Sequence, residues 1–177
     1  MKKYVLAALM AASSLSFTAI AQVKTSAQEV VPDLVKKREE QKTAIINAYL
    51  AMKNSLIISD AKKTAVTASE FSTALGKFKF KKLTMPEMNE SATARERIKA
   101  IADKIAASSS LNDQRKDMEK LSTEFWAIIE RLKPENMPLY QQKCPMTGAT
   151  WVSNEKKIEN PYYPKNMLTC GEVVAEK

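Results

Sequence analysis

Between residues 34 and 132 the apolar residues recur every three to four positions, and this spacing constrains the fold more than any other feature. The pattern divides into four segments: residues 34–58, 61–80, 91–108 and 112–132. The last segment shows the period of an amphipathic helix most clearly, at Met118, Leu121, Phe125, Ile128 and Leu132. Asp60, and Ser110 or Asn112, supply the oxygens that cap helix N-termini. The sequence therefore predicts a mainly α fold, a four-helix up-down bundle.

The helical period ends at Pro134, which stops the fourth predicted helix. Further prolines exclude a long helix beyond it, at Pro138, Pro145, Pro161 and Pro164. Residues 140–143 and 150–152 are candidates for short strands. We therefore expect residues 134–177 to form an irregular, partly β C-terminal cap, packed on the bundle of residues 33–133 within one domain.

The N-terminal residues have the three parts of a secretory signal peptide. Lys2 and Lys3 form a positive start, residues 4–15 are apolar, and Ala19 and Ala21 stand at the small-residue cleavage positions. We expect cleavage after Ala21, a flexible leader over residues 22–32, and a helix start at Pro32-Asp33. No later stretch has the roughly 20 apolar residues of a membrane span, so no stable membrane insertion is expected after signal removal.

The chain carries a formal net charge of +8, but its charges are interspersed and export argues against nucleic acid as a partner. The exception is the run Lys-Phe-Lys-Phe-Lys-Lys at residues 77–82. One interpretation is contact with an anionic surface. The other, which we favour at this point, is a helix C-terminus whose cations complement the helix dipole.

Histidine is absent, which removes the commonest general base and the commonest metal ligand. The three glycines, Gly76, Gly148 and Gly171, are too far apart to form a phosphate-binding loop. No two carboxylates have a spacing that would indicate a catalytic acid–base pair either. We therefore expect a protein that is not an enzyme.

Cys144 and Cys170 are the only cysteines, and they allow two interpretations. In an exported chain, two cysteines are expected to form a disulfide. The neighbouring methionines favour the second interpretation, because Met146 lies two positions after Cys144 and Met167 three before Cys170. Thiolates and thioethers are soft ligands that select copper(I) or silver(I). The candidate metal ligands are thus Cys144, Met146, Met167 and Cys170.

The tail has the pattern Tyr140…Cys144-Pro145-Met146…Gly148-Ala149…Trp151-Val152-Ser153…Ile158-Glu159-Asn160-Pro161-Tyr162-Tyr163…Met167-Leu168…Cys170-Gly171. It resembles a bacterial exported domain of unknown function, which also occurs appended to periplasmic adaptor subunits of copper/silver efflux systems. The resemblance implies a periplasmic helical domain that handles heavy metal, with copper(I) as the bound ion and heavy-metal efflux components as partners. Two departures are the absence of histidine and Pro164, which stands where relatives usually have glycine. The alternative is a disulfide-stapled interaction module of the cell envelope.

Overall fold

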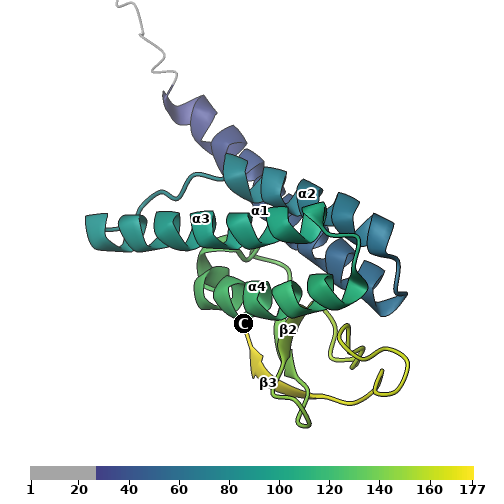
Figure 1. The fold of residues 1–177 in the computed structure, drawn as a ribbon. Coiled ribbons are helices and arrows are strands. Elements are labelled where there is room, and N and C mark those ends of the chain that lie inside the picture. The colour runs from purple at the N-terminus through teal and green to yellow at the C-terminus, as the bar shows by residue number, and fades with distance from the viewer. Residues whose placement is uncertain (1–26) are drawn as a thin grey trace, which may run out of the picture.

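The computed structural model describes residues 27–177, so the expected signal peptide and residues 22–26 lie outside the described part. Four helices follow one another: α1 (Ala27–Ile57), α2 (Ala61–Lys77), α3 (Met85–Ala107) and α4 (Leu111–Leu132). Each packs against the next in chain order, and a small sheet follows α4 (Figure 1). The prediction of a mainly α bundle with a partly β cap is confirmed. Among residues 27–177, no helix combines the length and the apolar composition of a membrane span.

Two predicted helix starts were wrong, and proline explains both. α1 begins at Ala27 and includes Pro32, the predicted start. Proline there removes only one hydrogen bond, close to the open end of the helix. α3 begins at Met85 instead of residue 91, because Pro86 fits the first turn. The carboxylate of Glu87 accepts hydrogen bonds from the Thr84 backbone N–H (2.8 Å) and hydroxyl (2.7 Å), which fixes this start.

The predicted end of the second helix was also wrong. α2 ends at Lys77, three residues earlier than expected, and Phe78 is extended, with φ −77° and ψ 128°. Phe78 and Phe80 are nevertheless buried. The segment after α2 therefore contributes to the core without being helical.

Three aromatic rings from three helices meet at the centre of the bundle. Tyr49 of α1 stacks on Phe125 of α4, with ring centroids 4.9 Å apart, and Phe71 of α2 meets both rings edge-on. All three side chains are fully buried. The apolar stripes of the sequence therefore converge on one core, as the periodicity predicts.

The cap is a three-stranded antiparallel sheet of β1 (Tyr140–Lys143), β2 (Thr150–Ser153) and β3 (Glu172–Glu176), with β1 in the middle. The first two strands match the predicted ones, and β3 was not predicted. Reciprocal backbone hydrogen bonds of 3.0 and 2.9 Å between Leu139 and Lys177 extend the β1–β3 pairing. Figure 1 shows the sheet below α4, on the side of that helix away from α3.

Candidate functional site

The loop between β1 and β2 positions Cys144, the first residue after β1. Its backbone N–H donates to the Ala149 carbonyl (2.9 Å), and its carbonyl accepts from the Gly148 N–H (2.8 Å). Gly148 has φ +76°, a conformation that glycine adopts without steric cost. This closed loop holds the Cys144 side chain inward, where it is fully buried.

Strand pairing brings Cys170 to the same place. β1 and β3 pair antiparallel with Lys143 opposite Glu172, so Cys144 continues toward the residues just before β3. Gly171 lies there, and a β-carbon on it would come within 2.8 Å of Ile158 Cγ2 and 2.9 Å of Trp151 Cη2. The chain next to Cys170 therefore approaches the tryptophan so closely that only glycine fits.

Asn160 fastens the loop that leads to Cys170. This side chain is fully buried, and its Oδ1 accepts hydrogen bonds from the backbone N–H groups of Tyr162 (2.9 Å) and Tyr163 (3.3 Å). Its Nδ2 donates to the Cys170 carbonyl (3.2 Å), while the Cys170 N–H donates to the Met167 carbonyl (3.0 Å). One asparagine thus ties the start of the loop to its end.

The two sulfur atoms lie 3.9 Å apart, and both cysteines are free thiols. A disulfide has a sulfur–sulfur length of about 2.05 Å, so the structure does not support the bonded state. The sulfurs are nevertheless in direct contact, with Cys144 buried and Cys170 half-buried. A side-chain movement of about 2 Å separates the thiol pair from a disulfide.

The two thiols have opposite pKa shifts. Burial raises the pKa of Cys144, but hydrogen bonds from the Thr147 hydroxyl, the backbone N–H groups of Thr147 and Met146, and Cys170 outweigh this and lower it. Burial, followed by the hydrogen bond to Cys144 and repulsion from it, raises the pKa of Cys170. Of the two thiols, Cys144 therefore loses its proton more readily than Cys170.

The predicted methionine ligands are less firmly placed than the cysteines. Met146 follows Pro145 in the β1–β2 loop and is 75 % exposed, so no packing holds its thioether against the thiols. Met167 is half-buried and precedes Cys170 by three residues. Within residues 27–177, no three side chains of histidine, cysteine, aspartate or glutamate are grouped so that they could hold a metal ion. The thiol pair is thus the only part of the predicted ligand set that the described structure shows in contact.

A buried network of hydroxyl groups joins this cap to the bundle. The Tyr49 hydroxyl lies 2.7 Å from Ser122 Oγ and accepts a hydrogen bond from the Val152 N–H (3.0 Å). The Tyr162 hydroxyl donates to the Thr150 carbonyl (2.6 Å) and lies 3.2 Å from Ser122 Oγ. Four segments therefore share one hydrogen-bonded cluster inside an apolar core: α1, α4, β2 and the loop after β2.

Sequence reasoning missed Thr147, Asn160 and Ser122, which position the thiols or the cap. Ser122 had a detectable signal, because it falls next to Leu121 on the apolar stripe of α4, where a hydroxyl needs a partner. Asn160 belongs to the tail pattern quoted above, but nothing in the sequence indicated its role, and Thr147 had no signal beyond its closeness to Cys144.

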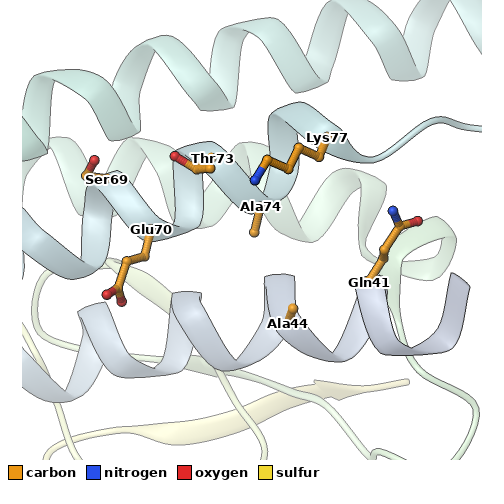
Figure 2. A pocket seen from close by; sticks show the side chains of 7 residues that line it. All are labelled: Gln41, Ala44, Ser69, Glu70, Thr73, Ala74 and Lys77. Atoms are coloured by element: carbon orange, nitrogen blue, oxygen red, sulfur yellow. The ribbon is translucent and has the colours of Figure 1, made fainter. Parts of the chain in front are cut away.

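A cavity of about 410 Å³ lies apart from the thiols, in the groove between α1 and α2. Figure 2 shows Ala44 of α1 and Ala74 of α2 pointing toward each other across this groove. Its lining consists of Gln41, Ala44, Ser69, Glu70, Thr73, Ala74 and Lys77. The two charged residues, Glu70 and Lys77, are two helical turns apart. The lining therefore supplies no cluster of reactive groups.

Comparison with known proteins gives one match. Residues 45–137 match a family model described as "Protein of unknown function (DUF3347)". No curated protein and no solved structure matches the chain. The matched residues cover most of the helical bundle and end before Cys144, so the cysteine-containing tail lies outside the match.

Proposed function

The chain belongs to the DUF3347 family, whose function is not known, and we propose a function from its own thiol pair: binding of a soft monovalent metal ion, copper(I) or silver(I). The observation that carries the proposal is the 3.9 Å contact between the sulfurs of Cys144 and Cys170. We also propose that the protein handles copper in the periplasm, together with heavy-metal efflux components. The support for this is the resemblance of the tail to a domain that occurs in copper/silver efflux systems.

The separation of the sulfurs fits two ligands of one ion. Metal–thiolate bonds are about 2.3 Å long, so two sulfurs bound to one ion can be at most about 4.6 Å apart. The observed 3.9 Å lies within this limit without movement of the backbone. Thiolates favour copper(I) over magnesium or calcium, and the chain has no histidine to complete a nitrogen-rich site.

The protonation of the pair also supports this chemistry. A metal ion binds thiolate, not thiol. The lowered pKa of Cys144 makes its proton easier to displace, and the raised pKa of Cys170 makes the second proton harder to displace. Cys170 and the exposed Met146 give an ion access from solvent, and thioethers of Met146 and Met167 are the candidates for completing the ligand set.

A competition titration tests the proposal. Reduced protein is titrated against a chromogenic copper(I) chelator, and we expect one equivalent of copper(I) to be withheld from the chelator. The double variant Cys144→Ser, Cys170→Ser should lose this binding, and submicromolar binding that survives in it would refute the ligand assignment.

The methionines need a matched comparison. Met146→Leu should weaken copper(I) binding, whereas Met85→Leu changes a similarly exposed thioether (68 % against 75 %) at the start of α3 and should not. If both variants bind as the unchanged protein does, the thioether of Met146 is not a ligand.

The second candidate is a disulfide-stapled interaction module without metal, which would require the sulfurs to close from 3.9 Å to about 2.05 Å. In that case protein isolated without reductant contains no reactive thiol, and copper(I) leaves its melting temperature unchanged. We expect instead two titratable thiols and a melting temperature that rises with copper(I), because a ligand that binds only the folded state stabilises it.

A further inference from the structure

The basic run after α2 is an extended segment with two different sides. Phe78 and Phe80 are buried, and their rings meet edge-on with centroids 5.3 Å apart. Lys79 and Lys81 alternate with them and are exposed, as alternate residues of an extended chain must be. Only Lys77 lies in the last turn of α2, so complementing the helix dipole does not account for the other lysines.

Two arginines from neighbouring helices fix this segment. Arg38 of α1 donates to the Lys79 carbonyl (3.0 Å), and its guanidinium lies 4.7 Å from the centre of the Phe78 ring. Arg95 of α3 donates to the Phe78 carbonyl (2.9 Å). The lysine side chains take no part in these contacts, so the fold does not need their charge.

The positive charge of the segment is not neutralised locally. The sequence contains no acidic residue between Glu70 and Glu87. In the described part of the chain, no salt bridge involves any of the four lysines, Lys77, Lys79, Lys81 and Lys82. Both neighbouring arginines add to this positive region, although Arg95 also pairs with Glu96.

An exposed apolar side chain lies beside this basic segment. Leu34 is 53 % exposed and stands one helical turn before Arg38, so it shares the face of α1 that meets Lys79. Figure 1 shows the connection from α2 to α3 leaving the bundle beside the first half of α1. Lysines and an apolar residue thus form one exposed surface, which we call the basic edge: Leu34, Lys77, Lys79, Lys81 and Lys82.

We propose that the basic edge is a docking surface for a membrane that contains anionic phospholipids. Lysine is a compact point charge without the bidentate geometry that arginine offers to a single phosphate. Four such charges, from the end of α2 to Lys82, suit the diffuse field of many headgroups, and each basic residue near an anionic bilayer strengthens attachment. Leu34 adds an apolar contact at the interface. This proposal is independent of the thiol pair.

Vesicle co-sedimentation of the full chain tests it. The protein should sediment with phosphatidylcholine vesicles that contain phosphatidylglycerol, and not with pure phosphatidylcholine vesicles. The variant Lys79→Gln, Lys81→Gln should lose about fivefold in partitioning for each lysine removed, roughly 25-fold in all. Added salt should reproduce the loss in the unchanged protein.

The matched control is Lys62→Gln, Lys63→Gln, which removes the same charge at the other end of α2. Both lysines are exposed, and the length of the helix places them roughly 21–22 Å from Lys77. This control should bind vesicles within about twofold of the unchanged protein. Equal losses in the two variants would show that only net charge matters and would overturn the assignment. Binding to soluble polyphosphate without binding to anionic vesicles would overturn the choice of a lipid partner.

Discussion

The hydrogen bonds between bundle and cap predict that Tyr49→Phe destabilises the protein. The Tyr49 hydroxyl is fully enclosed and accepts the Val152 N–H at 3.0 Å. The Ser122 hydroxyl donates its own hydrogen to the Met118 carbonyl (2.8 Å), so it receives one from Tyr49. Phenylalanine keeps the ring stacked on Phe125 and removes only the oxygen atom.

The expected cost follows from the groups left behind. Val152 is fully buried, so its N–H would have neither a protein acceptor nor bulk water. Leaving a buried donor unsatisfied costs about 1–3 kcal/mol, whereas the lost ring oxygen creates almost no cavity. We therefore expect Tyr49→Phe to lower the free energy of unfolding by about 2 kcal/mol and the melting temperature by roughly 4–8 °C.

Urea denaturation followed by far-UV circular dichroism measures this free energy. Tyr163→Phe is the matched control, because the Tyr163 side chain is 42 % exposed and should change stability by less than about 0.5 kcal/mol. If Tyr49→Phe is as stable as this control, the hydroxyl network does not hold the cap on the bundle and the reasoning fails.

Three further predictions concern pH and the loop before Cys170. Burial raises the pKa of Tyr49 from 10.0 to about 12, despite the hydrogen bond shared with Ser122 and the one accepted from the Val152 N–H, which lower it. The free energy of unfolding should therefore hold its full value below pH 10 and fall by up to about 3 kcal/mol as pH rises toward 12, with a smaller fall in Tyr49→Phe. Because the pKa of Cys170 is raised, copper(I) must displace its proton, so chelator competition should show an affinity that rises with pH near neutrality, by up to about tenfold per pH unit for each proton displaced. Asn160→Ala removes three hydrogen bonds from a buried site and should cost about 2–3 kcal/mol in urea denaturation, whereas Asn166→Ala, at an exposed position, should cost almost nothing.

The helices and most of their ends were predictable from the sequence, but the starts of α1 and α3 and the end of α2 were not. An apolar stripe specifies which residues are buried, whereas an end depends on a few local hydrogen bonds. The third helix was expected to begin at residue 91, yet the contacts between Glu87 and Thr84 fix its start earlier, with Pro86 in the first turn of α3. Asp60 was predictable as a cap because it accepts the Lys63 N–H within its own segment of chain.

The thiol contact was only half predictable. The sequence pointed to Cys144 and Cys170 as the residues that carry chemistry, but their closeness depends on the pairing of β1 with β3. β3 is almost wholly exposed and has no alternation of apolar and polar residues, so the sequence pattern did not predict a strand there. The network around Ser122 was hidden for a related reason, because its partners come from elements far apart in the chain.

Mutations should separate the contacts that hold the thiols together from those that hold the cap on the bundle. The thiols are held by β1–β3 pairing and by Gly171, whereas Tyr49 holds the sheet to the bundle. Gly171→Ala places a β-carbon against Trp151, which is fully buried and cannot yield, so the chain that carries Cys170 must move. We expect Gly171→Ala to weaken copper(I) binding at least tenfold for a stability cost of about 1–3 kcal/mol, and Tyr49→Phe to lower stability similarly while leaving the affinity unchanged. If both variants lose affinity in proportion to their loss of stability, the thiol pair depends on the whole fold and not on the local pairing of β1 and β3.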